Sequence, residues 1–267
     1  MNMTSARRDE VPLIPEQRRE LLMRLLHREK VLSVHQLTEM LGVSHMTVRR
    51  DISALEGDGR VHAIPGGVRL ATLIGTEPSR ADKSVMRAPH KAAIAREAVR
   101  LLRDDMVVYL DAGTTTQALA ARLDGLTGLT IVTNDFGIVE EAGLRGIDTV
   151  HVGGQVEHEN RSSIGIIAAT TLRGLNVDLA VISASSWSSR HGVTTPSPGK
   201  VEVKAAAMES ASASVLVADS SKYGSFSMYR VAGLQGFSTI VTDDALPAGA
   251  VDSVRQLGVD LVLAADE

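Results

Sequence analysis

The sequence predicts a two-domain protein. An N-terminal winged helix-turn-helix of mixed α and β structure is expected over residues 14–70, and a C-terminal α/β domain with an open, mostly parallel sheet over residues 90–267. Three observations predict this fold class. The segment SVHQLTEMLGVSHMTVRRDI has apolar residues at helical spacing on both sides of a glycine. The segment GDGRVHAIPGGVRL places turn residues around a short alternating run, as in a β-hairpin, and further along β-rich runs such as MVVYLD and LTIVTND alternate with amphipathic segments.

The helix-turn-helix begins near Ser33. Gly42 stands where a tight turn between two helices needs a residue that tolerates positive φ, and Ser44 can cap the second helix by accepting a backbone N–H. The predicted buried positions are Leu37, Met40 and Leu41 in the first helix, with Met46, Val48, Ile52 and Leu55 in the second. The opposite face of the second helix carries His45, Thr47, Arg49 and Arg50.

Hydroxyl and guanidinium groups near the exposed start of a short helix suit the major groove of DNA, where they reach base edges and phosphates. The alternative is an ordinary helical pair in which Arg49 and Arg50 are solvated or pair with Asp51 or Glu56. The hairpin that follows favours DNA binding, because it has the place and length of a wing. An amphipathic helix completes the unit with Arg18, Arg19, Leu22, Leu25 and Leu26.

Charge and composition limit the classes of protein. Residues 1–70 hold 11 Lys and Arg against 9 Asp and Glu, and the remainder holds 17 against 23, so the predicted DNA-binding part is only weakly basic. Tight binding to double-stranded operator DNA then requires two winged domains on one duplex, hence a homodimer or a higher homo-oligomer. The absence of Cys and of any apolar stretch near twenty residues predicts a cytoplasmic protein with no membrane span.

Residues 71–89 are expected to be a partly ordered linker, since they contain Gly75, Pro78 and Pro89 and no sustained apolar period. From Lys91 onward, short β-rich runs are followed by amphipathic segments, which predicts βαβ units with right-handed crossovers. Ligands of such open sheets bind beyond the carboxyl ends of the strands. The residues that end each strand are therefore the candidates for a site.

Small polar residues end several of the predicted strands. Asp111 is followed by Gly113, Thr114, Thr115 and Thr116, a pattern that presents backbone N–H groups, hydroxyls and a helix N-terminus to an anion such as phosphate. The alternative is a tight turn at the glycine and a threonine that only caps the helix. The other strand ends supply Asn134, Asp135, Gly153, Gly154, Ser183, Ser185 and residues 219–222. Together with Lys222 they predict a convergent polyol and phosphate site.

Glu202 and Lys204 lie at the start of a predicted helix. Beside a sugar phosphate, an acid and an amine can transfer protons or bind hydroxyl groups. The alternative is that both side chains are solvated in the first turn of the helix. For Lys204 this alternative is the favoured interpretation. Trp187 either packs on a ligand or lies at the rim of the site. The histidines show no metal-ligand spacing and there is no Cys, so neither a metal site nor a cofactor is expected.

These residues together resemble the DeoR family of bacterial transcription regulators, from about Glu16 to the end of the chain. The matching positions in the DNA-binding half are Arg18, Leu22, Leu26, Leu37, Leu41, Val43, Ser44, residues 47–51 and Leu55. In the other half they are residues 110–115, Thr133, Asn134, Gly153, Gly154, Gly165, Asp178 and residues 192–194 and 219–224. The resemblance implies a second domain similar to ribose-5-phosphate isomerase that senses a phosphorylated sugar, in a repressor of a carbohydrate or sugar-acid catabolic operon.

The motifs and the resemblance together define two sets of candidate binding residues. The residues expected to bind operator DNA are Ser44, His45, Thr47, Arg49, Arg50 and His62. The residues expected to bind the effector are Asp111, Gly113, Thr114, Thr115, Thr116, Asn134, Gly153, Gly154, Ser183, Glu202 and Lys222. The chain is thus expected to be a regulator and not an enzyme.

The chain departs from the family pattern at two places. His62 and Pro65 precede the paired glycines of the wing, where the family usually has Arg and then His. Residues 183–187 replace a glycine-rich strand end with hydroxyls and an indole, which favours an effector other than the commoner hexose and glycerol phosphates, such as a sugar-acid phosphate. The rival interpretation is an active sugar-phosphate isomerase with a fused winged domain; against it, Glu202 has no evident carboxylate partner for enediol chemistry.

Overall fold

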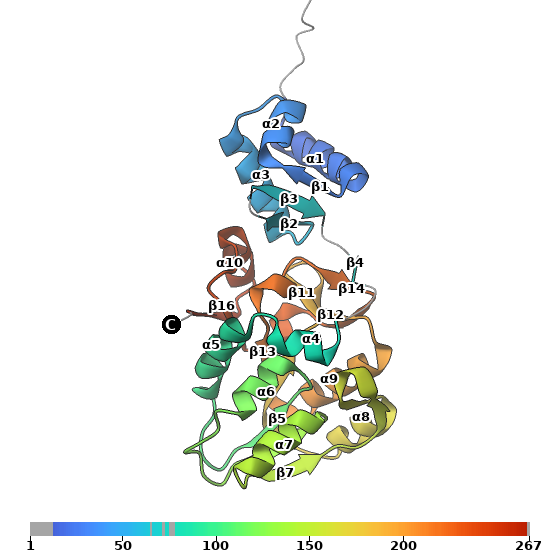
Figure 1. Cartoon of the computed structure of the whole chain (residues 1–267), viewed down its shortest axis with the longest axis vertical. Coiled ribbons are helices and arrows are strands. Elements are labelled where there is room, and N and C mark those ends of the chain that lie inside the picture. Colours follow the sequence, from blue (N-terminus) through green and yellow to red (C-terminus); the bar gives the residue numbers. More distant parts are fainter. Residues whose placement is uncertain (1–12, 65, 71–72, 75–77, 266–267) are drawn as a thin grey trace, which may run out of the picture.

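The computed structural model describes residues 13–64, 66–70, 73–74 and 78–265 of the chain. Figure 1 shows the small winged domain at one end and the larger α/β domain at the other, with helix α10 (Ala248–Arg255) on the side of the larger domain that faces the smaller one. Pro65 of the predicted wing and Gly75 of the expected linker lie outside the described residues, as does the side chain of His62.

The winged domain has the predicted helix-turn-helix. Gly42 ends the first helix at a φ of 63°, and the side-chain oxygens of Ser33 and Ser44 cap the two helices by accepting backbone N–H groups. A three-stranded antiparallel sheet in the order β1-β3-β2 forms the wing. The elements are α1 (Pro15–Glu29), β1 (Val31–Ser33), α2 (Val34–Leu41), α3 (His45–Gly57), β2 (Val61–Ile64) and β3 (Gly67–Leu70).

The core of the winged domain differs from the prediction at two methionines. Met40 is 46% exposed and Met46 is 68% exposed, so the buried side of α3 consists of Val48, Ile52 and Leu55 without Met46. The reason is that residues 48, 52 and 55 follow the helical repeat, whereas position 46 lies in the first turn, beyond the edge of the core. The same buried side holds Asp51, which forms an ion pair with Arg18.

The larger domain contains a seven-stranded sheet in the order β17-β16-β13-β10-β5-β6-β7, and all six pairings are parallel. The mostly parallel open sheet predicted from the sequence is therefore confirmed. In sheet order the strands are β17 (Asp260–Ala264), β16 (Thr239–Asp243), β13 (Ala211–Val217), β10 (Val177–Ser183), β5 (Val107–Leu110), β6 (Thr130–Thr133) and β7 (Asp148–His151).

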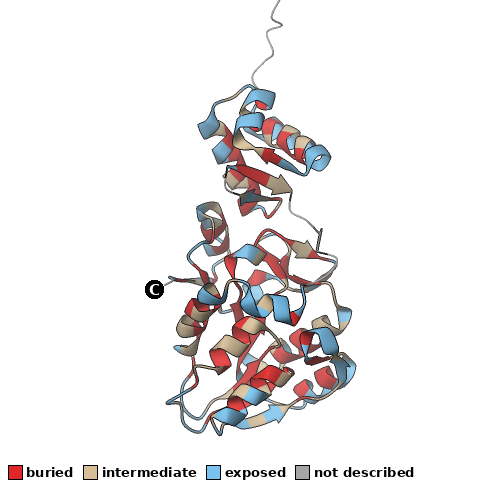
Figure 2. Cartoon of the chain, in the orientation of Figure 1, coloured by how far each residue is buried: buried red, intermediate tan, exposed pale blue. Residues whose placement is uncertain are grey.

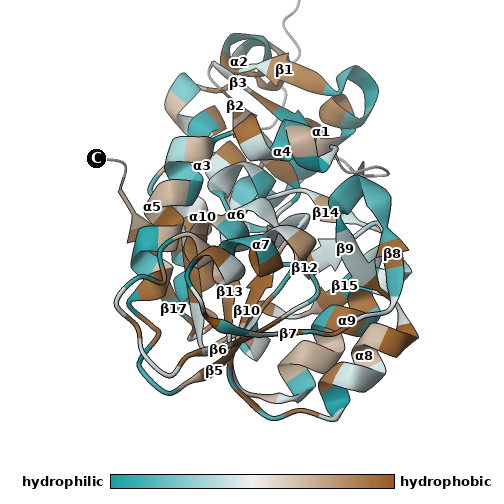
Figure 3. Ribbon diagram, turned by 60° about the horizontal axis from the view of Figure 1, so that its bottom comes forward, coloured by the Kyte–Doolittle hydropathy of each residue, from teal (hydrophilic) through white to brown (hydrophobic). Residues whose placement is uncertain are grey.

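Helices cover both faces of this sheet and form two hydrophobic cores. One core includes α5 (Ala88–Val99), α6 (Thr114–Ala120) and α7 (Phe136–Leu144), and the other includes α8 (Ile166–Arg173), α9 (Pro198–Glu209) and α10. Figure 2 shows the buried residues concentrated along the sheet, and Figure 3 shows that the central strands are hydrophobic. A strand that is buried on both faces has a continuous apolar sequence, and this pattern predicted the parallel sheet.

Shorter strands surround the carboxyl ends of the main sheet. They are β8 (Gln155–Glu157) paired with β9 (Ser162–Ile164), and the antiparallel sheet β11 (Ser186–Ser188), β12 (Gly192–Thr195) and β15 (Tyr229–Ala232). Three 3-10 turns, η1 (His158–Asn160), η2 (Ser220–Lys222) and η3 (Leu234–Gly236), connect these pieces. None of the described helices is both long and apolar enough to cross a bilayer.

Part of the expected linker is attached to the larger domain. Strand β4 (Leu73–Ile74) pairs with β14 (Phe226–Ser227), and helix α4 (Arg80–Val85) lies against α6. Arg80 of this helix is buried, with its guanidinium nitrogens 2.6 and 2.9 Å from the carboxylate oxygens of Asp135. A buried bidentate ion pair fixes the position of both partners. Helix α4, in the second half of the expected linker, is therefore held against the α/β domain.

Candidate functional site

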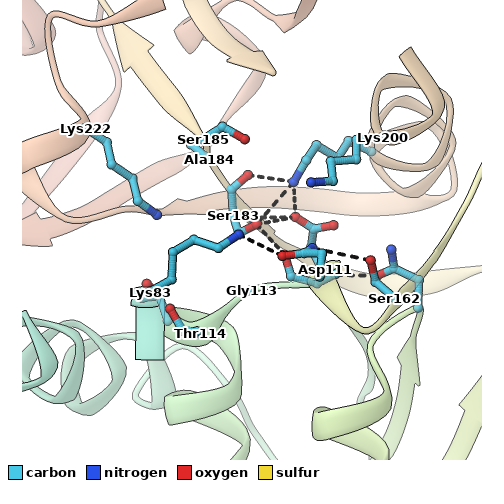
Figure 4. Close-up of a pocket in the computed structure, with 15 residues that line it drawn as sticks. Lys83, Asp111, Gly113, Thr114, Ser162, Ser183, Ala184, Ser185, Lys200 and Lys222 are labelled. Carbon is cyan, nitrogen blue, oxygen red and sulfur yellow. Dashed lines mark hydrogen bonds and ion pairs between the residues drawn. The ribbon is translucent and has the colours of Figure 1, made fainter. Parts of the chain in front are cut away.

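A pocket lies at the carboxyl ends of β5, β6 and β10, where the open sheet was expected to bind a ligand. We call it the lysine pocket. Its lining residues are Lys83, Asp111, Ala112, Gly113, Thr114, Thr115, Asn134, Asn160, Ser162, Ser183, Ala184, Ser185, Lys200, Lys204 and Lys222. Figure 4 shows that Lys83 and Lys222 enter it from one side and Lys200 from the other. Four ammonium groups and one carboxylate thus line a single concavity.

Each of three lysines also contacts an oxygen at the rim of the pocket. The Nζ atom of Lys83 donates to Oδ1 of Asn160 at 2.7 Å, and that of Lys200 lies 2.9 Å from a carboxylate oxygen of Glu157. The Nζ atom of Lys222 is 3.7 Å from a carboxylate oxygen of Asp219. These contacts hold the ammonium groups at the rim, and none of them fills the pocket itself.

Asp111 and Lys204 form a buried ion pair at the base of the pocket. Asp111 is 1% exposed and Lys204 is 4% exposed. Lys204 also donates to the carbonyl oxygen of Ser183 at 2.8 Å, and the backbone N–H and hydroxyl of Ser183 donate to Asp111 at 2.9 and 2.7 Å. The interpretation of Lys204 as a solvated first turn is wrong. Its helix begins at Pro198 and not at Val201, so Lys204 lies in the second turn on the inner face.

The loop after Asp111 is built differently from the predicted backbone cradle. The N–H groups of Ala112 and Gly113 already donate to the side chains of Asn134 and Asp135, at 2.9 and 3.1 Å. Helix α6 has only seven residues, so its dipole is short. In this loop the side chains, and not free N–H groups on these two residues, are available for a ligand.

Gly113 permits a close approach and does not form a tight turn. Its φ of 170° is extended backbone, and a Cβ atom added there would lie 3.0 Å from the Cβ atom of Ser183. The hydroxyl of Thr116 donates to the carbonyl oxygens of Asp111 and Gly113, so this threonine shapes the loop without lining the pocket. The hydroxyl of Thr115 is buried and has no hydrogen-bond partner among the described residues, although Thr115 lines the pocket.

The structure brings together seven of the eleven residues predicted to bind the effector: Asp111, Gly113, Thr114, Thr115, Asn134, Ser183 and Lys222. Thr116, Gly153, Gly154 and Glu202 do not line the lysine pocket. Four further residues that line the pocket were not predicted from the sequence: Lys83, Asn160, Ser162 and Lys200. The spacing of Lys200 and Lys204 at i and i+4 was a usable signal, because it places both amines on one helix face. No local pattern marks Lys83, which reaches the pocket from the expected linker.

Trp187 takes neither of its two expected roles. It is fully buried, and its ring meets that of Tyr223 edge-on with centroids 4.9 Å apart. It is therefore a core residue beneath the pocket. Among the described residues, no group of three or more His, Asp or Glu side chains is placed to hold a metal ion.

The exposed start of α3 forms a candidate DNA-binding face. Ser44, His45, Met46, Arg49 and Arg50 are exposed, and Thr47 is half-buried with its hydroxyl 2.9 Å from that of Ser44. The two acidic residues considered as partners of the arginines have other partners. Asp51 pairs with Arg18 on the buried side, and Glu56, also buried, accepts the backbone N–H of Ala63 at 2.7 Å. Asp51 thus lies away from the exposed arginines, whereas Glu56 and Arg49 line a common pocket on one face of α3.

A second buried amine lies next to the lysine pocket. The Nζ atom of Lys91, on α5, donates to the carbonyl oxygens of Met86, at 2.7 Å, and of Lys83. Burial, together with the nearby positive charge of Lys222, lowers the pKa of Lys91 to about 8. A neutral amine keeps two N–H groups, which match the two carbonyl acceptors.

We expect the stability of the protein to rise with pH in the range where Lys91 titrates differently in the folded and unfolded states. The unfolded amine keeps its proton up to its ordinary pKa of 10.5, whereas the folded amine loses it near 8. Between these values the unfolded chain binds more protons, so the contribution of Lys91 to the free energy of unfolding increases with pH; below 8 it is constant. Urea unfolding of wild type and Lys91→Met across this range isolates the contribution. Parallel curves for the two proteins contradict the prediction.

A winged helix-turn-helix joined to an α/β domain with a cationic pocket defines a ligand-sensing, DNA-binding regulator. The comparisons identify the family. Residues 18–73 match the family model described as the DeoR-like helix-turn-helix domain, and residues 86–244 match the one described as the DeoR C terminal sensor domain. The chain belongs to the DeoR family of DNA-binding transcriptional regulators.

Curated relatives match along nearly their whole length. An uncharacterized HTH-type transcriptional regulator of Haemophilus influenzae is 40% identical over 95% of this chain and 99% of its own. The uncharacterized HTH-type transcriptional regulator YgbI of Escherichia coli is 40% identical over 96% of this chain and 100% of its own. The transcriptional repressor AccR of Agrobacterium fabrum is 33% identical over 85% and 89%.

Among solved structures, ribose 5-phosphate isomerase A of Methanocaldococcus jannaschii is similar over 49% of this chain and 52% of its own, with 22% identity and a TM-score of 0.37. This likeness is distant and partial.

Proposed function

We propose that this regulator is a repressor of a carbohydrate or sugar-acid catabolic operon, and that a phosphorylated sugar-like effector in the lysine pocket controls its affinity for operator DNA. The observation that carries the proposal is the lysine pocket, whose lining holds four lysines and one carboxylate. Lys204 pairs with that carboxylate, and the carboxylates paired with Lys200 and Lys222 lie outside the lining, so the lining itself is cationic and favours an anionic ligand. A phosphate monoester is such an anion at neutral pH.

Two further observations support a polyol phosphate. The buried hydroxyl of Thr115 has no hydrogen-bond partner among the described residues, and a ligand hydroxyl or phosphate oxygen would satisfy it. Ser162, Ser183 and Asn160 add hydroxyl and amide groups to the lining. The matched sensor-domain model and the relative named a transcriptional repressor agree with this function.

The exposed start of α3 is the proposed operator-binding element. Ser44, His45, Thr47, Arg49 and Arg50 would contact bases and phosphates, and His62 of β2 would contribute from the wing. Two such helices on one palindromic site require a homodimer or a higher oligomer. An effector that binds more tightly to an arrangement unsuited to the operator then lowers DNA affinity, by a factor of ten for about 1.4 kcal/mol of differential binding.

The position of Glu202 favours a regulator over an isomerase. It does not line the lysine pocket, and the carboxylate that does, Asp111, is already engaged by Lys204 and Ser183. We therefore expect the purified protein to leave ribose 5-phosphate and glucosamine 6-phosphate unconverted. Turnover of either compound overturns this part of the proposal.

The effector site is tested by thermal stability in the presence of single compounds: inorganic phosphate, ribose 5-phosphate, glycerol 3-phosphate, fructose 6-phosphate and 6-phosphogluconate. At a concentration 100 times its dissociation constant, a ligand stabilises the folded state by about 2.7 kcal/mol. We expect at least one of these phosphates to raise the melting temperature of wild type, and Lys222→Ala to lose most of that increase. Lys30→Ala, which removes an exposed lysine of the winged domain, is the matched control. An equal response of wild type and Lys222→Ala rejects the lysine pocket as the effector site.

A further inference from the structure

The carboxyl end of the recognition helix α3 is held by two hydroxyl groups of the α/β domain. The hydroxyl of Tyr223 donates to the carbonyl oxygen of Gly57 at 3.2 Å, and the hydroxyl of Ser189 donates to the same oxygen. Gly57 is the last residue of α3, and carbonyl groups in the last turn of a helix have no acceptor role within the helix itself. We call Tyr223 and Ser189 the α3 latch.

Both residues of the α3 latch are close in sequence to residues that line the lysine pocket. Lys222 lines the pocket and directly precedes Tyr223, and Ser185 lines it four residues before Ser189. Two short segments, residues 185–189 and 222–223, therefore each extend from the pocket to the end of α3.

The two segments are joined to each other, so they are expected to move as one unit. The backbone N–H of Gly224 donates to the carbonyl oxygen of Trp187 at 3.0 Å, and the Trp187 and Tyr223 rings pack edge-on. The hydroxyls of Ser189 and Tyr223 lie 3.3 Å apart. Burial raises the pKa of Tyr223, which keeps its hydroxyl protonated and able to donate.

The surface that receives the latch is closely packed. A Cβ atom added at Gly57 would lie 2.5 Å from the hydroxyl of Ser253 on α10, and one added at Gly249 would lie 2.8 Å from the carbonyl oxygen of Ser53 on α3. Glycine on both helices allows their backbones to come into contact. Because close-packed interfaces change between discrete arrangements and do not deform gradually, a small change at the latch can alter the angle of α3 relative to the α/β domain.

We propose that the α3 latch carries the state of the lysine pocket to the recognition helix, so that Tyr223 and Ser189 are positioning residues that couple the pocket to the operator-binding face. The inference rests on the proposed function of the pocket and names the route by which the pocket regulates DNA binding. Coupling between two sites is reciprocal. Operator binding must therefore alter the pocket through the latch, and this can be measured without knowing the effector.

The test measures how fast an amine-acylating reagent labels Lys222 in the full-length protein, with and without an operator duplex selected by the protein from a random pool. Lys222 is a suitable reporter because its side chain is 21% exposed. In wild type we expect operator binding to change the labelling rate of Lys222. In Tyr223→Phe combined with Ser189→Ala, the duplex should still bind and the change should be lost. Tyr229→Phe, which removes a phenol hydroxyl from β15, should behave as wild type.

Two results overturn the proposal: an unchanged labelling rate in wild type with DNA bound, or a change that persists in the double variant. If the melting temperature of the double variant is much lower than that of wild type, the measurement is repeated with each single variant, which removes only one oxygen atom. Failure of the lysine pocket to bind any phosphate is detected separately in the thermal-stability test, which contains no DNA. Failure of the proposed effector site can thus be distinguished from failure of the proposed coupling through the α3 latch.

Discussion

Lys204→Met is expected to lower the free energy of unfolding by about 3–5 kcal/mol, because it removes one partner of a buried ion pair and leaves Asp111 charged in the interior. Ser183 and Tyr109 would still donate to the carboxylate, but neutral donors do not replace an ammonium group. For a domain of this size the loss corresponds to a decrease in melting temperature of roughly 10 °C. Urea unfolding and thermal denaturation without ligand measure both quantities.

Two variants separate the buried charge from a general effect of changing the helix. Glu202→Gln alters an exposed residue on the same helix, and a change within about 0.5 kcal/mol of wild type is expected. Asp111→Asn combined with Lys204→Met removes both charges, and it should be more stable than Lys204→Met alone, since no uncompensated carboxylate remains. If Lys204→Met is as stable as Glu202→Gln, the ion pair does not stabilise the fold.

The burial of Lys204 was not predictable from its local sequence. The apolar and polar pattern of residues 201–211 predicts a helix, but the start of that helix was placed too late because Pro198 was not taken as its first residue. An error of three residues in the boundary assigned Lys204 to the first turn of the helix, although it lies in the second. A buried lysine was therefore mistaken for a solvated one.

The fold was predictable because its elements carry local signals. Strands buried on both faces are continuous apolar runs, and the caps at Ser33 and Ser44 with Gly42 between them are local chemistry. The strand-end rule also placed Asp111, Asn134 and Ser183 in one pocket. What these residues share is that backbone topology alone brings them together.

The rest of the site could not be predicted because it depends on long-range packing. Lys83 reaches the lysine pocket only because Arg80, one turn earlier, docks α4 through its ion pair with Asp135. Trp187 is buried because Tyr223 packs against it from a distant segment. Neither contact produces a pattern in the local sequence. For this reason Lys83 was not predicted and Trp187 was assigned the wrong role.

Arg50→Ala combined with Arg49→Ala is expected to cause the largest loss of operator binding, while leaving the melting temperature unchanged. Both side chains are exposed at the start of the recognition helix, and the buried side of that helix is formed by other residues. An arginine that contacts a base contributes about 1–3 kcal/mol, and one that contacts a phosphate contributes about one unit to the slope of log affinity against log salt. We therefore expect affinity to fall by at least about tenfold and the salt slope to become shallower.

Titration of a fluorescent operator duplex at several salt concentrations measures both effects. Arg103→Ala, which removes an exposed arginine of the α/β domain, is the matched control and should bind as wild type. A loss of affinity that is equal for the operator and for an unrelated duplex assigns the two arginines to phosphate contacts, whereas a larger loss for the operator assigns at least one of them to a base. Wild-type affinity in the double variant is incompatible with α3 as the recognition helix, since no other part of its exposed face carries a comparable charge.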